Sequence, residues 1–365
     1  MSLKVYQNIF LYPNFVNALQ KIILNRSSSN FNHIHKYFLE QRYGGVHYLE
    51  AGNINNVFIN SDSLKFMNRI WALENNLPRG TSMDKIIYAQ IEEHKSDVFY
   101  TQNPAKYSYS FLKNLPGSVK HKVCWQSPPG INTNFKGFDL VLNNFPKSLE
   151  KYSSSGIKTA YFCPSFDPGV KKLHSPSKKP IDVVFIGGYS RHHSIRNAFL
   201  SHISKLGDQY KIVYSLDISK YTASLNFIES YMRPLSKKNG FDTISQYTIP
   251  PLYGMNLYRL ILEAKITINC AVDSAMNDRG NMRCFETMSC GSLLISDSGK
   301  YPKGFIDGQN FVMYKDFDDA EDLVLFYLEN EEARKNISTN GRNLLKKKFS
   351  KELQWSKFCR LIGTL

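Results

Sequence analysis

The sequence predicts an α/β protein of two domains, each a parallel sheet wrapped by helices. Strand-like and helix-like stretches alternate along most of the chain. The length of 365 residues exceeds that of one average domain, and a hydrophobic content of 42% gives each half enough apolar residues for its own core. A proline- and lysine-rich segment near the middle of the chain has the composition of an exposed linker.

The first half opens with a strand followed by a helix. Residues 3–12 alternate enough for a strand, and residues 14–25 carry apolar side chains at helical spacing before a run of serines ends the pattern. Further strands are expected over residues 46–49, 97–101, 122–126, 138–142 and 159–163, and further helices over residues 31–42, 62–95 with a break at 78–80, and 146–153.

The second half repeats this alternation. A buried-strand run at residues 181–186 leads into a glycine pair and a helix from about residue 194 to 206. Strands are also expected over residues 210–214, 266–270, 292–296 and 311–314, and helices over residues 255–264, 320–328, 331–347 and 351–361. The resulting domains are an N-terminal one at residues 1–166, a linker at 167–180, a C-terminal one at 181–348 and a C-terminal helix at 349–365 that is free to cross back to the first domain.

Charge and cysteine content narrow the class of protein. Lysine and arginine outnumber aspartate and glutamate by 46 to 31, and the net charge of +15 indicates an anionic partner. The basic clusters are not interleaved with aromatic residues, so nucleic acid is not the expected partner. The six cysteines form no C-x-x-C pair, which favours reduced thiols in a cytoplasmic protein. Neither a signal-peptide pattern nor a membrane-spanning run is evident.

The main chemical signal lies in residues 277–297. Asn281 is placed to cap a helix and Gly291 to end it. Arg283 and Glu286, three positions apart, share one face near the helix N-terminus, where a phosphate is favoured. This arrangement suits a diphosphate and a sugar hydroxyl. Taken alone, an ordinary surface helix with an ion pair explains the stretch equally well.

A glycine pair gives a second signal at the same place. Gly187 and Gly188 lie between a predicted strand and a predicted helix, where the backbone can approach a ligand closely, and Arg191 follows them. Open parallel sheets bind ligands beyond the carboxyl ends of their strands, which is where both signals fall in the second domain. Their convergence favours a nucleotide site over a surface helix.

In order and spacing these pieces resemble a known family. They are FIGGYSR at residues 185–191, PPLYG at 250–254, IN at 268–269, N-x-R-x-F-E-x-M-x-C-G at 281–291 and LLISD at 293–297. Over roughly residues 181–345 they are similar to the C-terminal domain of GT-B glycosyltransferases, especially the spore-maturation (CgeB-like) branch of the group-1 transferases. The resemblance implies two Rossmann-like domains facing a cleft, with a nucleotide sugar held mainly by the second.

The resemblance also implies roles for individual residues. Glu286 would hydrogen-bond the ribose hydroxyls, while Arg283, Arg191 and nearby backbone amides would hold the diphosphate. Fixed cations and helix amides stabilise a leaving nucleotide without a metal, so no metal or other cofactor is expected. The expected donor-binding residues are Gly187, Gly188, Tyr189, Arg191, Tyr253, Arg279, Asn281, Met282, Arg283 and Glu286.

The catalytic details remain open. Many retaining relatives carry two glutamates with seven residues between them, the later of which corresponds to Glu286. Arg279, not an acid, is expected at the position of the earlier one and is expected to act as a further phosphate cation. Retention and inversion at the anomeric carbon are therefore both possible. Besides Arg283, which would stabilise the leaving group, the candidate catalytic residues are the general bases His47 and Glu50 of the first domain, with His33, His35 and Asp97 as further candidates. Each of these bases is more often structural.

The leading hypothesis is a cytoplasmic, metal-independent glycosyltransferase acting on a glycan, lipid-linked or other acceptor in bacterial surface-polysaccharide or related glycoconjugate synthesis. Its basic face would allow peripheral contact with an anionic inner membrane surface. Two alternatives are a sugar-nucleotide epimerase or hydrolase of the same fold, and a non-catalytic protein that binds nucleotide sugars or nucleic acid.

Overall fold

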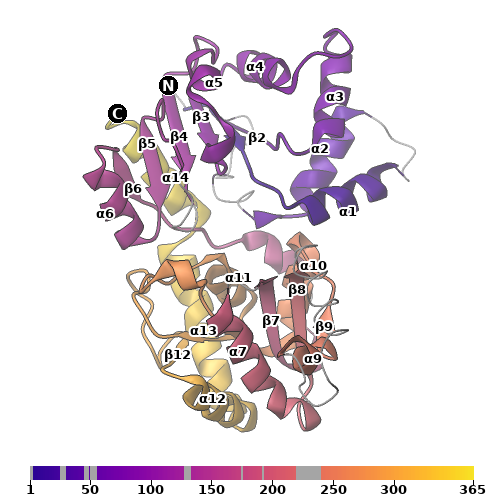
Figure 1. Ribbon diagram of the computed structural model, residues 1–365, viewed down its shortest axis with the longest axis vertical. Coiled ribbons are helices and arrows are strands. Elements are labelled where there is room, and N and C mark those ends of the chain that lie inside the picture. The colour runs from indigo at the N-terminus through magenta and orange to yellow at the C-terminus, as the bar shows by residue number, and fades with distance from the viewer. Residues whose placement is uncertain are drawn as a thin grey trace, which may run out of the picture. The chain divides into compact units, whose positions relative to one another are not determined.

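The computed structural model describes residues 3–24, 30–44, 49, 56–126, 133–173, 176–190, 193–218 and 240–365. The chain forms two compact units (Figure 1). Unit 1 comprises Met1–Ser165 and Ser350–Leu365, and unit 2 comprises Phe166–Phe349. Each unit contains one six-stranded parallel sheet with helices, so the predicted α/β fold is confirmed. The C-terminal helix returns to unit 1, as expected.

Unit 1 is built around a sheet whose central strands are buried. Its strands are β1 (Val5–Asn8), β2 (Val57–Asn60), β3 (Val98–Thr101), β4 (His121–Trp125), β5 (Leu140–Asn143) and β6 (Thr159–Tyr161), in the order β2-β1-β3-β4-β5-β6. Its helices are α1 (Pro13–Leu24), α2 (Phe31–Glu40), α3 (Lys65–Glu74), α4 (Met83–His94), η2 (Pro104–Lys106), α5 (Tyr109–Lys113), α6 (Pro146–Ser154) and α14 (Lys351–Ile362). The second strand is thus Val57–Asn60; most of the strand expected at residues 46–49 lies outside the described residues.

Aromatic side chains pack on the unit 1 sheet. Tyr6 and Phe99 belong to a core cluster that includes Ile87 and Ile91 of α4. The C-terminal helix contributes Phe358, which is fully buried and packs edge-on against Tyr100 and Phe162 with ring centroids 5.6 and 6.0 Å away. Apolar burial of this kind explains why α14 belongs to unit 1.

Unit 2 has the same construction. Its strands are β7 (Ile181–Tyr189), β8 (Ile212–Ile218), β9 (Thr248–Ile249), β10 (Ala264–Asn269), β11 (Leu293–Asp297) and β12 (Val312–Tyr314), in the order β12-β11-β10-β7-β8-β9. Its helices are η3 (Pro168–Lys172), α7 (Ser194–Ile203), η4 (Ser204–Asp208), α9 (Gly240–Ser245), α10 (Gly254–Glu263), η5 (Asp273–Ala275), α11 (Met282–Cys290), α12 (Phe317–Glu329) and α13 (Glu331–Lys348).

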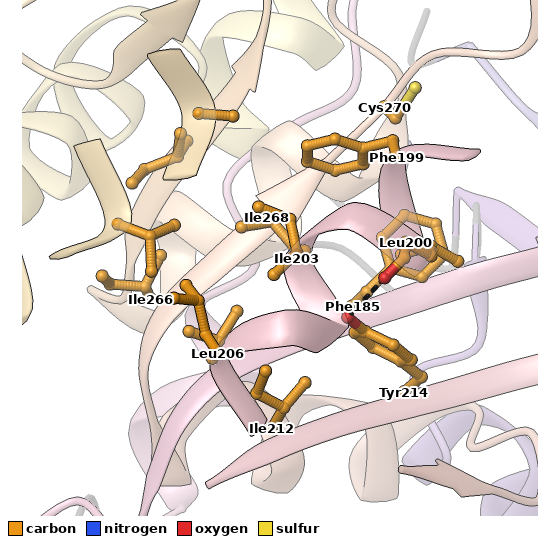
Figure 2. Close-up of a cluster of buried hydrophobic side chains, with 14 of the residues drawn as sticks. Phe185, Phe199, Leu200, Ile203, Leu206, Ile212, Tyr214, Ile266, Ile268 and Cys270 are labelled. Atoms are coloured by element: carbon orange, nitrogen blue, oxygen red, sulfur yellow. Dashed lines mark hydrogen bonds between the residues drawn. The ribbon is translucent and has the colours of Figure 1, made fainter. Parts of the chain in front are cut away.

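The core of unit 2 lies on both faces of its sheet because alternate residues of a strand point to opposite sides. On one face, Phe185 of β7 packs with Tyr214 of β8 and with Phe199 and Leu200 of α7 (Figure 2). The Tyr214 hydroxyl donates a hydrogen bond to the Leu200 carbonyl at 3.0 Å. On the other face, residues of α10 pack on the remaining side chains of β7. This packing holds the ends of β7 and β10 in place.

Part of the segment expected to be an exposed linker is buried in unit 2. Val170 of η3 is only 1% exposed and joins the α10 core cluster. At the junction, the Phe166 amide donates to the Phe349 carbonyl at 2.7 Å. The two ends of unit 2 are therefore joined by a main-chain hydrogen bond. None of the described helices is both long and apolar enough to cross a membrane.

Candidate functional site

The strand order of unit 2 has a topological switch point between β7 and β10, and we refer to the ligand position that such a point predicts at their carboxyl ends as the β7–β10 crevice. The chain proceeds from β7 outward to β8 and β9 on one side, then returns and proceeds from β10 to β11 and β12 on the other. Such a reversal leaves a gap at the carboxyl ends of the two inner strands, which is the usual ligand position in open α/β sheets. Gly188 and Tyr189 end β7, and Asn269 and Cys270 stand at the end of β10.

Arg283 and Glu286 meet beside this crevice. The Arg283 Nη1 lies 2.5 Å from the Glu286 Oε2, and the two side chains are only 14% and 8% exposed. Arg283 Nε also donates to the carbonyl of Ile186 in β7 at 3.1 Å. The expected pair is therefore a largely buried ion pair that ties α11 to the central strand, and the alternative of a solvated surface helix is wrong.

Burial and pairing act in opposite directions on Glu286. Loss of water raises the pKa of its carboxyl group, and the Arg283 charge opposes this rise without cancelling it. A carboxylate held beside a cation in such surroundings is a strong hydrogen-bond acceptor for a ligand hydroxyl. The geometry is compatible with the ribose contact that the sequence predicted.

Asn281 is the N-cap residue of α11, but its side chain does not cap the helix. It accepts no capping hydrogen bond from a backbone amide of the first turn. Instead its Nδ2 donates to the Asn269 Oδ1 at 3.2 Å, and its Oδ1 accepts from the Cys284 thiol at 3.2 Å. Asn281 thus fastens the start of α11, where Met282 is the first residue, to the end of β10. Gly291 ends the helix with a positive φ of 69°, as expected.

Arg279 was expected to be a phosphate cation, but the structure pairs it with a carboxylate. Its Nε lies 2.6 Å from the Asp297 Oδ2, with side-chain exposures of 13% and 16%. Its Nη1 donates to the carbonyls of Met276 and Asp278 at 2.7 and 3.0 Å. Gly299 leaves room for it, because a Cβ there would lie 2.6 Å from the Arg279 Cγ. Arg279 is therefore a clamp between two loops, and its charge is already neutralised by a carboxylate.

An acid stands at the position at which the retaining relatives have their other glutamate. The residue eight positions before Glu286 is Asp278, which is 1% exposed. Its backbone forms a parallel bridge with Lys300. The expectation that Arg279 and no acid occupies this position is wrong, because the residue eight positions before Glu286 is Asp278.

The other predicted donor-binding residues have varied environments. Gly187 and Gly188 are partly exposed at the end of β7, whereas the Tyr189 side chain is 7% exposed and belongs to the core. The Tyr253 hydroxyl donates to the Asp217 Oδ2 at 2.7 Å, which joins the start of α10 to β8. Arg191 lies outside the described residues. Tyr189 therefore contributes packing rather than an open ligand contact.

Arg196 is a site residue that sequence reasoning missed. It lies in the first turn of α7 and is 5% exposed. Its guanidinium donates to the Cys270 carbonyl through Nε and Nη2 at 3.1 and 2.8 Å, and to the Gly188 carbonyl through Nη1 at 3.1 Å. Arg196 therefore bridges the two strands that flank the crevice.

The candidate general bases of the first domain have varied positions. His47 and Glu50 lie outside the described residues. His35 stacks on Phe58 at 5.3 Å and contacts the Ile59 carbonyl through Nε2 at 2.6 Å, a structural environment. Asp97 precedes β3 and accepts from the Lys4 amide at 3.0 Å, at the amino edge of the sheet.

The carboxyl edge of the unit 1 sheet instead carries Asp62. This residue follows β2, is 1% exposed and accepts hydrogen bonds from the Tyr107 hydroxyl and from Lys106 Nζ, the latter at 2.8 Å. Its amide donates to the Asn8 side chain at 2.9 Å. No group of three or more histidine, cysteine or acidic side chains suited to a metal ion occurs among the residues for which the structure gives positions.

Comparison with known proteins connects this geometry to glycosyl transfer. Residues 198–359 match a protein family described as glycosyl transferase-like. This segment contains Arg283 and Glu286, but begins after the glycine pair and Arg196. No curated protein matches the chain.

Solved structures share the fold at low sequence identity. HepE of Anabaena in complex with UDP has a TM-score of 0.59 at 10% identity, with 100% of each chain covered. A glycosyltransferase from Rickettsia africae has a TM-score of 0.55 at 14% identity, covering 99% of this chain and 98% of its own. Sucrose-phosphate synthase from Thermosynechococcus elongatus gives 0.52 at 12% identity, covering 77% and 76%. The chain thus has the GT-B fold with two Rossmann-like domains.

Proposed function

We propose that this protein is a glycosyltransferase that takes a sugar from a nucleoside diphosphate donor and attaches it to a glycan or other acceptor. The observation that carries the proposal is the buried pair of Arg283 and Glu286 beside the β7–β10 crevice. The match of residues 198–359 to a glycosyl transferase-like family, and a GT-B neighbour crystallised with UDP, support it.

The chemistry follows from the charges at this edge of the sheet. Transfer breaks the bond between the anomeric carbon and the diphosphate oxygen, and the nucleoside diphosphate leaves with an added negative charge. In this proposal Arg283 and the N-terminal amides of α11 stabilise that charge. Because fixed protein groups provide this stabilisation, the proposal includes no metal.

In this proposal Glu286 binds the ribose hydroxyls. Its carboxylate is held by the Arg283 Nη1 on one side, which fixes its orientation before a ligand arrives. Asp278, which is 1% exposed, is the candidate acid at the position of the other glutamate of retaining relatives. The acceptor belongs to the glycan or lipid-linked class, and synthesis of a surface polysaccharide or related glycoconjugate at the inner membrane face is the proposed setting.

The first experiment is a thermal-shift panel of UDP, ADP, GDP and their common sugar conjugates, because a ligand that binds the native state raises its Tm. The best donor is then tested for transfer to candidate acceptors and, without acceptor, for epimerised or hydrolysed product. Glu286→Ala and Arg283→Ala should reduce transfer by about a hundredfold or more. Arg259→Ala, which removes an exposed arginine from α10 of the same unit, is the matched control. Absence of any nucleotide-dependent shift would refute the proposal.

A further inference from the structure

The buried cation Arg196 occupies a position that disfavours positive charge. It occupies the first turn of α7, where the helix dipole disfavours positive charge. Burial also disfavours its charged form and lowers the pKa of the guanidinium. Asp273 and Asp297 act on it at a distance, but no ion pair in the described part of the chain includes Arg196. An unneutralised buried charge is therefore kept at this position.

All three hydrogen bonds of Arg196 go to main-chain oxygens at the carboxyl edge of the sheet. Its partners are the Gly188 carbonyl at the end of β7 and the Cys270 carbonyl just beyond β10. These oxygens carry partial negative charge and flank the crevice in which an anionic ligand would bind. A single guanidinium covers both of them and joins the two strand ends.

The surroundings of Arg196 hold it in this position. Its guanidinium carbon lies 5.7 Å from the centre of the Phe185 ring. A Cβ at Gly187 would lie 3.0 Å from two atoms of that ring and 3.8 Å from the Arg196 Nη1. The first glycine of the pair is thus required by the packing of the arginine and its supporting ring. Packing inside the protein is therefore a second reason for a glycine at position 187, besides the expected contact with the ligand.

We infer that Arg196 is a positioning residue for the donor diphosphate. It removes the repulsion of two carbonyl oxygens at the crevice and fixes Gly188 at the end of β7 relative to Cys270 just beyond β10. Its positive charge adds to the potential that attracts the anion. This inference rests on the proposed function, because it concerns the same ligand, and it adds a residue that does not itself touch the reacting atoms.

The test compares Arg196→Met with a matched variant, Arg334→Met. Arg334 is also buried, at 7% exposure, and its guanidinium likewise donates to two main-chain carbonyls, those of Tyr327 and Leu328 at the end of α12. It belongs to the same unit, but its nearby charges are Glu331 and Asp182, the latter at the amino end of β7. Both variants remove a buried guanidinium from carbonyl groups, at opposite edges of the sheet.

The measurement is the ratio of diphosphate to monophosphate affinity, determined by calorimetry with whichever of UDP, ADP and GDP the wild type binds most tightly. Arg196→Met should weaken diphosphate binding at least tenfold and reduce the ratio. Arg334→Met should lower the Tm and leave the ratio unchanged. Arg196→Lys, which keeps the charge, should recover part of the lost affinity; it also decides the matter if the methionine variant does not fold.

Different outcomes separate this inference from the proposed function. A wild-type protein that binds none of the nucleotides overturns both. A wild type that binds normally, with an affinity ratio in Arg196→Met within twofold of it, overturns the inference alone. An equal loss of ratio in Arg334→Met would also overturn it, because the effect would then follow from general destabilisation of unit 2.

Discussion

The structure makes a specific prediction about Arg279, which the sequence presented as a phosphate cation. The change Arg279→Met keeps the apolar stem and removes the charge that lies 2.6 Å from the Asp297 Oδ2. Breaking a buried ion pair by removing one partner costs about 3–5 kcal/mol. Since the two side chains retain 13% and 16% exposure, we expect a cost somewhat below that range, about 2–3 kcal/mol after allowance for solvent screening.

For a unit of this size, 1 kcal/mol corresponds to a Tm change of about 2–4 °C, so the cost of about 2–3 kcal/mol corresponds to a decrease of about 4–12 °C by differential scanning fluorimetry. Burial already raises the pKa of Asp297, and Arg279 opposes the rise. A carboxyl group with a raised pKa in the folded state stabilises the fold at low pH and loses that contribution as the pH rises. The Tm deficit of Arg279→Met should therefore grow between about pH 5 and pH 8.

Asp297 provides the control for this experiment. The double variant Arg279→Met/Asp297→Asn should be more stable than Arg279→Met alone, because no unpaired carboxylate remains. Nucleoside diphosphate affinity should stay within about threefold of the wild type in the folded single variant, a difference of roughly 0.6 kcal/mol. A wild-type Tm combined with tenfold weaker diphosphate binding would show that Arg279 faces the phosphates and that the clamp is not its role.

Two further predictions concern Glu286 and the glycines around α11. Glu286→Gln should abolish most nucleotide binding, and its Tm relative to that of the wild type should rise from about pH 5 to about pH 8, because burial raises the pKa of the wild-type carboxyl and its ionised form is disfavoured in the fold; a Tm difference independent of pH would contradict the assignment. Gly299→Ala should lower stability by about 2–3 kcal/mol, because its Cβ would lie 2.7 Å from the Asn277 carbonyl oxygen at a φ of 157°. Gly291→Ala, with its nearest neighbour at 3.7 Å, should cost only about 1 kcal/mol through its positive φ, and equal Tm changes for the two would refute this distinction.

Local sequence patterns predicted the fold and one half of the site. The alternation of strands and helices was enough for two parallel sheets, because each crossover needs a helix of suitable length. The i, i+3 spacing of Arg283 and Glu286 was enough for their pairing, because both lie on one helix. In each case the interacting residues are close in sequence.

The parts that were missed depend on long-range contacts. Arg196 meets Cys270 across 74 residues, and no spacing within α7 indicates that partner. The charge and position of Arg279 in the sequence suggested a ligand cation, but its environment depends on Asp297 at the end of β11. Tyr189 follows the glycines as a ligand residue would, yet the pleat of β7 directs its side chain into the core.

The return of α14 to unit 1 has a consequence for the order of folding during synthesis. Tyr100 and Phe162 appear early on the ribosome, but Phe358, which packs against both, is made only after the whole of unit 2. Unit 2 is continuous and can complete its core first, whereas unit 1 must wait with an apolar surface uncovered. In a growing chain this surface is a natural binding site for chaperones. Premature termination before residue 350 would leave unit 1 permanently in that state.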